Sequence, residues 1–251
     1  MRTFFRFLGF LLLVGANASA AEIENPSAMF REANRAYREG DYRRATRLYQ
    51  SLVDKQWNSA DVFYNLANAH FREKHLGLAI LNYEKAKRFR PRDRDVRANL
   101  AYATGLIEYR VEDKRNWYVR TVNTFLASFT REELGVLTLG LGLVFWGVWG
   151  FCLYLRPGLS WGWGRKTLLG FFLFSVFLWV SKEIQLATLR EAIILKSQAA
   201  VRYGPSHKDQ VAFRLGEGIK IRIKKKSGDW SWIVLKNGES GWMLDEEIGG
   251  V

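Results

Sequence analysis

The sequence predicts a multidomain membrane protein with an all-α solenoid of helical repeats, two transmembrane helices and a small all-β barrel. Three observations predict this fold class. The segment 21–110 contains a 34-residue repeat, two long apolar stretches follow it, and residues 190–251 alternate apolar and polar side chains between glycine turns. A composition of 48% hydrophobic and 25% charged residues in a chain of 251 residues excludes a disordered protein.

The N-terminal segment 1–20 has the pattern of a secretory signal peptide. Arg2 and Arg6 precede a short apolar core over residues 7–16, and the small residues 18–20 match a cleavage site. The core is too short to span a bilayer as a stable helix. An uncleaved N-terminal anchor is the alternative, so the sequence leaves open whether this segment is removed.

The segment that follows repeats with a shift of 34 residues. The shift aligns small residues that let helices approach closely and large residues that fill the space between them. The aligned pairs are Ala33 with Ala67, Ala45 with Ala79, Tyr37 with Phe71, and Tyr49 with Tyr83. This pattern resembles the tetratricopeptide repeat, which implies an antiparallel helix pair per repeat. The segment 21–110 then holds about two and a half repeats, the third consisting of a first helix only.

One set of polar residues recurs in the same register. In the tetratricopeptide-repeat family, this register lies on the concave face of the first helices, where an Asn amide can both donate to and accept from a peptide backbone. The resemblance therefore implies a groove for an extended or acidic-ended peptide. A solvated polar helix face is the alternative. The candidate groove residues are Arg31, Asn34, Arg38, Asn65, Asn68, Arg72 and Asn99.

The chain carries a formal net charge of +13, which raises the question of a nucleic-acid partner. Its basic residues are spread along the whole chain, and the densest run, 88–95, is interrupted by Asp93 and Asp95. This run is expected to be a solvated turn in which one of these aspartates caps the next helix. We therefore expect no nucleic-acid partner.

Two apolar stretches predict transmembrane helices at residues 134–155 and 167–187. The first contains no charged residue, and Thr130 with Glu133 forms a capping-box pattern before it. The second is shorter in its uncharged part, but Lys166 and Lys182 can extend their charges to the interfaces. For this second stretch, a buried or interfacial helix is the alternative.

The loop at residues 156–166 contains three basic residues and no acidic one, which places it in the cytoplasm. Both soluble domains then lie on the periplasmic side of a bacterial inner (cytoplasmic) membrane. The segment 111–133 is expected to include a juxtamembrane amphipathic helix on the lipid bilayer, with packing against the repeats as the alternative. Its apolar face would consist of Val122, Phe125, Leu126 and Phe129.

The C-terminal segment 190–251 has the period-two alternation of short strands, and Asn237-Gly238 is a hairpin signal. The order of its glycines and tryptophans resembles the bacterial SH3-like domain, which implies a small barrel that binds peptides or cell-wall material. At least two of its candidate contact aromatics are expected to be core residues by alternation. These aromatics are Tyr203, Trp230, Trp232 and Trp242.

The sequence offers no catalytic constellation. It contains no glycine-rich phosphate loop and no nucleophile elbow, and Cys152 lies within an apolar stretch without a base partner. His70 and His75 are five residues apart, which is the wrong spacing for two metal ligands on one helical face. We therefore expect no enzymatic activity, no cofactor and no metal site.

The order of the modules resembles the tetratricopeptide-repeat (BatE-type) members of the bacterial aerotolerance (Bat) operon proteins. The stretch 90–103, RPRDRDVRANLAYA, carries much of this resemblance. It implies a non-enzymatic envelope adaptor that works with von Willebrand factor A domain membrane proteins and indirectly with a MoxR-type ATPase. A cell-wall sensor or tether that binds peptidoglycan is the main alternative, and a factor that assembles an envelope enzyme is another.

Overall fold

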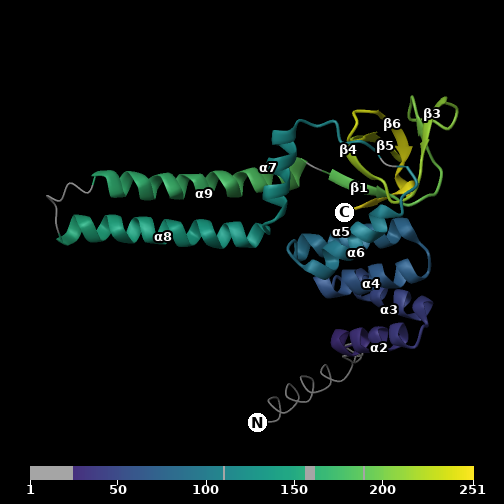
Figure 1. Ribbon diagram of the computed structural model, residues 1–251, viewed down its shortest axis with the longest axis horizontal. Coiled ribbons are helices and arrows are strands. Elements are labelled where there is room, and N and C mark those ends of the chain that lie inside the picture. Colours follow the sequence, from purple (N-terminus) through teal and green to yellow (C-terminus); the bar gives the residue numbers. More distant parts are fainter. Residues whose placement is uncertain (1–24, 110, 156–161, 189) are drawn as a thin grey trace, which may run out of the picture.

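The computed structural model describes residues 25–109, 111–155, 162–188 and 190–251 (Figure 1). The expected signal peptide at 1–20 and residues 156–161 of the expected loop lie outside this described part. The helices, in chain order, are α2 (Pro26–Arg38), α3 (Tyr42–Asp54), α4 (Ala60–Arg72), α5 (Leu76–Phe89), α6 (Arg94–Gly105), α7 (Trp117–Ala127), α8 (Arg131–Leu155) and α9 (Gly162–Thr188).

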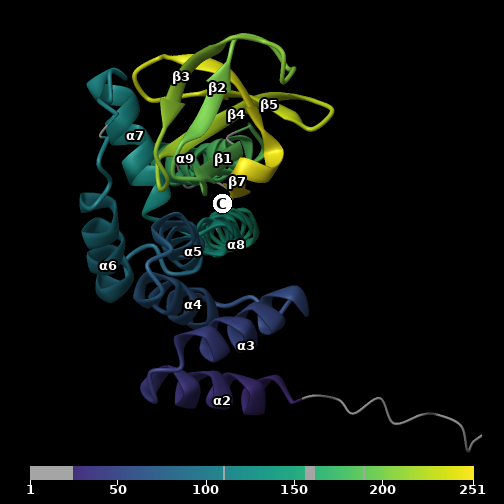
Figure 2. The ribbon, with the colours of Figure 1, turned by 90° about the vertical axis from the view of Figure 1, so that its right-hand side faces the viewer.

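Helices α2 to α6 form a layered stack, here called the helical stack, in which α2 lies farthest from the sheet and α5 lies against it (Figures 1 and 2). Helices α2, α4 and α6 begin at residues 26, 60 and 94, and α3 and α5 begin at 42 and 76, so the starts recur every 34 residues. Ala33, Ala45, Ala67 and Ala79 are fully buried. Their small side chains allow the close helix contacts of the stack.

Side-chain caps determine where most helices of the stack begin. An Asn, Asp or Ser side chain satisfies backbone N–H groups of the first turn, which otherwise lack a partner. The caps are Asn25 for α2, Asp41 for α3, Ser59 for α4 and Asp93 for α6. The expectation that an aspartate of the run 88–95 caps the next helix is confirmed by Asp93, which accepts from two backbone N–H groups.

Helices α8 and α9 lie side by side as a hairpin that projects from the rest of the molecule (Figure 1). Both are long and apolar enough to cross a membrane by length and composition. The expected capping box is present, since Thr130 Oγ1 accepts from the Glu133 N–H and Glu133 Oε2 accepts from the Thr130 N–H. Helix α9 begins at Gly162 rather than at the expected residue 167.

Helix α7 crosses the end of the hairpin that lies nearest the stack (Figure 1). It covers only part of the segment 111–133. Its expected apolar face is only partly covered, since Leu126 is buried whereas Val122 and Phe125 are exposed. The buried Lys182 of α9 donates from Nζ to the Leu126 carbonyl at 3.0 Å, which joins the end of α7 to the hairpin. Arg92 of the stack pairs with Glu133 at the start of α8.

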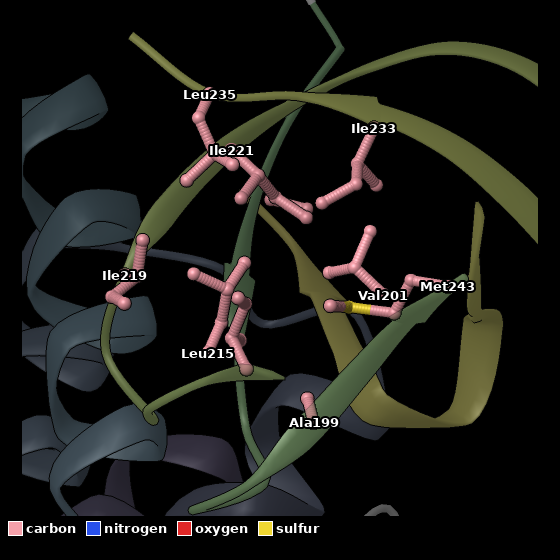
Figure 3. Packing of buried hydrophobic residues seen from close by; sticks show 10 residues of the cluster. Ala199, Val201, Leu215, Ile219, Ile221, Ile233, Leu235 and Met243 are labelled. Atoms are coloured by element: carbon pink, nitrogen blue, oxygen red, sulfur yellow. The ribbon is translucent and has the colours of Figure 1, made fainter. Parts of the chain in front are cut away.

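Residues 190–251 form one antiparallel sheet, here called the β domain, with the strand order β3-β2-β6-β5-β4-β1-β7. Its core consists of side chains from several strands that point toward one another, among them Val201, Ile221, Ile233 and Met243 (Figure 3). The strands are β1 (Arg190–Ile194), β2 (Ala199–Arg202), β3 (Val211–Leu215), β4 (Lys220–Ser227), β5 (Trp230–Val234), β6 (Ser240–Leu244) and β7 (Ile248–Gly250).

The β domain docks directly on α5. The Gly77 N–H of α5 donates to Glu217 Oε2 at 2.9 Å. A Cβ at Gly77 would lie 2.8 Å from the Ile194 carbonyl oxygen, so this contact requires glycine. Ile193 of β1 belongs to the same buried cluster as Ile80 and Leu81 of α5. The stack and the β domain therefore share a continuous apolar interface.

Ionic contacts reinforce this interface. Lys220 Nζ of β4 lies 3.2 Å from Glu84 Oε2 of α5 and 2.7 Å from Glu191 Oε2 of β1.

A single residue separates the end of α9 at Thr188 from the start of β1 at Arg190. The stack and the β domain thus lie at the same end of the α8–α9 hairpin (Figure 1).

Candidate functional site

The predicted groove asparagines hydrogen-bond to one another within the helical stack. Asn34 Oδ1 of α2 accepts from Asn65 Nδ2 of α4 at 3.0 Å. It also accepts from the Tyr49 hydroxyl of α3 at 2.5 Å. One residue therefore joins three helices through a single amide oxygen.

The same arrangement recurs 34 residues later. Asn68 Oδ1 accepts from Asn99 Nδ2 at 3.1 Å and from the Tyr83 hydroxyl at 2.5 Å. Asn99 Nδ2 also donates to the Tyr64 hydroxyl at 3.0 Å. The repeated register noticed in the sequence thus corresponds to a repeated hydrogen-bond network.

Burial fixes the protonation state of this network. It raises the pKa of Tyr49 to about 12, and it raises the pKa of Tyr83 further above its ordinary value. Both hydroxyls therefore remain donors, and each needs the asparagine acceptor that it has. The structure thus gives these asparagines a role in joining helices.

The three predicted groove arginines have different surroundings. Arg31 and Arg38 are exposed on α2, and Arg31 borders a hollow of about 440 Å³ together with Glu32 and Arg35. The Arg72 guanidinium donates to the Tyr42 hydroxyl from Nε and Nη2 at 3.0 and 2.9 Å. Arg72 is therefore held against α3 although it is exposed, as Arg31 and Arg38 are.

A larger hollow, of about 670 Å³, lies between α5 and α6, here called the α5–α6 hollow. Small side chains form part of its lining, and basic side chains outnumber the one acidic side chain. It is lined by Glu84, Lys87, Arg94, Arg97, Ala98, Leu100, Ala101 and Thr104. Sequence reasoning missed this site because it assigned the basic run 88–95 to a solvated turn and followed only the asparagine register.

The candidate aromatics of the β domain divide into core and surface. Trp230 and Trp242 are both buried, as the alternation predicted for at least two of the four. Trp232 is half-buried, and Tyr203 is 69% exposed. Tyr203 and Trp232 therefore remain as candidate contact residues.

A basic side chain covers the tryptophan pair. The Trp232 and Trp242 rings meet edge to face with centroids 5.5 Å apart. Lys225 Nζ lies 5.6 Å from the Trp232 centroid and 5.0 Å from the Trp242 centroid. This arrangement is a cation–π contact, so Lys225 of the basic run 224–226 packs on aromatic rings. The surface offers an aromatic platform with a positive charge above it.

The two histidines do not lie along one helix, as the spacing argument assumes. Helix α4 ends at Arg72 and α5 begins at Leu76, so the five-residue spacing does not run along one helix. The turn instead brings His70, Glu73 and His75 together, with one potential ligand atom of each within 4.8 Å of the others. These three residues could hold a metal ion, although the sequence spacing argued against it.

Comparison with known proteins identifies one part of the chain. Residues 196–250 match the family model described as a bacterial SH3 domain, which covers strands β2 to β7. The expected SH3-like domain is thereby confirmed. No curated protein matches the chain.

Proposed function

We propose that this chain is a non-enzymatic adaptor of the bacterial envelope. In this proposal, α8 and α9 anchor it in the cytoplasmic membrane, with the helical stack and the β domain on the periplasmic side. The observation that carries the proposal is the direct junction of the stack and the β domain at one end of the apolar hairpin. Such a junction holds two binding modules in a constant relative position, which raises the effective concentration of the second module once the first has bound.

The helical stack, in this proposal, is a tetratricopeptide-repeat solenoid of two and a half repeats. The 34-residue recurrence of helix starts and the fully buried alanines support it. Because α6 has no following partner helix within the described stack, its outer face is the natural place for another chain to pack.

The partner is proposed to dock an acidic segment into the α5–α6 hollow. Lys87, Arg94 and Arg97 supply positive charge, and Ala98 and Ala101 leave room for backbone approach. Most of these residues lie in the stretch 90–103, which resembles the Bat family. We accordingly propose a Bat-type complex with a von Willebrand factor A domain membrane protein, linked through it to a MoxR-type ATPase.

Site-specific photo-crosslinking in native membranes tests this proposal. A photoreactive amino acid at Ala98 should capture a von Willebrand factor A domain protein. The same probe at exposed Arg43 on α3 is the matched control and should not. Equal capture from both positions, or capture of no such protein from Ala98, would refute the adaptor function.

The bacterial SH3 match favours a second candidate function, which is peptidoglycan binding through the β domain. Exposed Tyr203 and half-buried Trp232 would provide stacking surfaces for it. Sedimentation of the detergent-solubilised chain with purified cell wall tests this function. Binding that is lost in Tyr203→Ala and kept in Tyr109→Ala, an exposed tyrosine outside the β domain, would support it. Absence of co-sedimentation would rule it out.

A further inference from the structure

The turn between α4 and α5 gathers three side chains with metal-ligating groups. His70 lies in the last turn of α4, Glu73 is its C-cap residue and His75 is the N-cap residue of α5. One potential ligand atom of each lies within 4.8 Å of the others. Between them, Lys74 has a φ of 66°, which reverses the chain and brings the two histidines together. Their ring centroids are 6.0 Å apart.

The 34-residue recurrence supplies an internal comparison for His75. Between α2 and α3, the equivalent residue is Asp41, which accepts from the Arg44 N–H at 3.0 Å and caps α3. His75 makes no side-chain cap. The start of α5 therefore lacks a stabilising side-chain cap, and an imidazole occupies the N-cap position instead.

Two further positions of this turn, His70 and Lys74, also differ from their equivalents, whereas Glu73 is equivalent to Glu39. The equivalent of His70 is the buried Ala36, and the equivalent of Lys74 is Gly40, which has a φ of 83°. A lysine in this left-handed conformation is strained where glycine is not. His70, Lys74 and the uncapped His75 thus all make this turn less stable than its equivalent between α2 and α3. Several unfavourable features in one place are typical of functional positions.

The burial of His70 and its unpartnered nitrogen indicate that the imidazole binds a ligand. His70 is 7% exposed, and its Nδ1 has no hydrogen-bond partner among the residues that the structure describes. A buried polar atom without a partner is unfavourable unless something binds it, and an imidazole nitrogen is a common metal ligand.

We propose that His70, Glu73 and His75 bind one divalent transition-metal ion of the zinc type. Two imidazole nitrogens and one carboxylate oxygen are a donor set that Zn²⁺ accepts, and three protein ligands leave a position for water. The Thr46 hydroxyl of α3 donates to Glu73 Oε2 at 2.6 Å, which orients the carboxylate as an outer-shell partner. Binding would draw the ligand atoms from within 4.8 Å to about 3.4 Å of one another.

The position of the ion connects it to the interface with the β domain. His75 lies two residues before Gly77, whose N–H donates to Glu217. An ion held by both histidines would link the end of α4 to the start of α5, which carries the β domain. The site is independent of partner docking at the α5–α6 hollow.

Zinc binding by the full chain tests the proposal. The untagged chain in detergent at pH 7.5 is titrated with Zn²⁺ against a chromophoric chelator, and its melting temperature is measured with and without Zn²⁺. We expect one ion per chain and an increase in melting temperature with Zn²⁺. His75→Asn should raise the Zn²⁺ dissociation constant about tenfold or more. Because Asn is a good N-cap, this variant should also melt at a higher temperature than the wild type without Zn²⁺.

Two further variants complete the test. His70→Ala places the equivalent residue of the α2–α3 pair, Ala36, at this position and should abolish the zinc-induced increase in melting temperature. His207→Asn removes the third histidine, which lies in the β domain against Trp230, and should bind Zn²⁺ as the wild type does. The proposal is overturned if the wild-type chain does not bind Zn²⁺ at micromolar concentration, or if His75→Asn and His207→Asn bind it equally.

Discussion

Lys220 and its two acidic partners show how single residues join the stack to the β domain. Burial opposes ionisation of Glu84, but Lys220, with smaller contributions from Lys87 and Lys236, outweighs this cost and holds the pKa of Glu84 below its ordinary value. Burial likewise acts to lower the pKa of Lys220, but Glu84 and Glu191 raise it above its usual range. Glu84 and Lys220 therefore each stabilise the charged form of the other, and removal of one leaves a buried charge without its partner.

Lys220→Met should lower the free energy of unfolding by about 3 kcal/mol, because it leaves Glu84 buried and unpaired. Urea unfolding of the detergent-solubilised chain, followed by tryptophan fluorescence, measures the change. Arg44→Ala is the matched control, because its pair with Glu32 has both side chains about half exposed and should contribute less than about 1 kcal/mol. Similar losses in both variants would show that the Lys220 contact behaves as a surface pair.

The pKa of Glu84 also predicts a dependence on pH. Because its pKa in the folded chain lies below the unfolded value, its contribution is complete above that unfolded value and is lost as the pH falls through the folded value. Stability should therefore decrease in acid, and Glu84→Gln should make the decrease less steep. Urea midpoints between about pH 7 and pH 3 measure this, and parallel curves for the two proteins would contradict it.

Asn68→Ala should destabilise the stack by about 1–3 kcal/mol, because it leaves the buried Tyr83 hydroxyl without its acceptor. Circular dichroism melting of the chain measures the effect. Asn68→Ala combined with Tyr83→Phe should be less destabilising than the sum of the two single changes. A purely additive double variant would show that the hydrogen bond contributes nothing.

At the scale of elements, the first turn of α5 determines how closely the β domain can approach. Gly77→Ala would place a Cβ 2.8 Å from the Ile194 carbonyl, so backbone must shift and the interface should loosen by about 1–3 kcal/mol. Gly105→Ala is the matched helical control, because a Cβ there meets nothing within 4 Å and alanine favours a helix. Protease digestion under native conditions measures the loosening, and equal cleavage of both variants would contradict it.

The elements themselves could be predicted from local patterns. The alternation in residues 219–224 and the Asn237-Gly238 turn led to a strand and a hairpin that the structure contains, with Gly238 at a φ of 97°. The capping box at Thr130 placed the start of α8 closely. Such features depend on neighbours within a few residues of the chain, and for this reason a single sequence reveals them.

Contacts between distant residues could not be predicted in this way. Nothing in the sequence indicates that Gly77 lies against Ile194, or that Glu84 meets Lys220. The spacing argument for His70 and His75 assumes an uninterrupted helix, whereas the left-handed Lys74 reverses the chain between them. The groove asparagines were recognised by their register, but only the packed stack shows that Asn34 and Asn68 bond to buried tyrosines.

At the scale of the whole molecule, the stack and the β domain should face the same side of the membrane. In a Cys152→Ser background, Arg43→Cys and Lys208→Cys should both react with a membrane-impermeant maleimide in spheroplasts. Gly164→Cys, at the opposite end of the hairpin, should react only after the membrane is permeabilised. Labelling of only one of the first two positions would contradict the proposed topology.

The single residue between α9 and β1 limits how far the β domain can search. A flexible linker of n residues explores a radius of roughly 5–6 Å × √n, and here that radius is negligible beside the size of the molecule itself. The contacts of Glu217 and Lys220 with α5 also hold the β domain against the stack. In the proposed topology, a ligand of the β domain therefore has to come to the bilayer surface. Binding should then become faster as the concentration of the ligand near that surface increases.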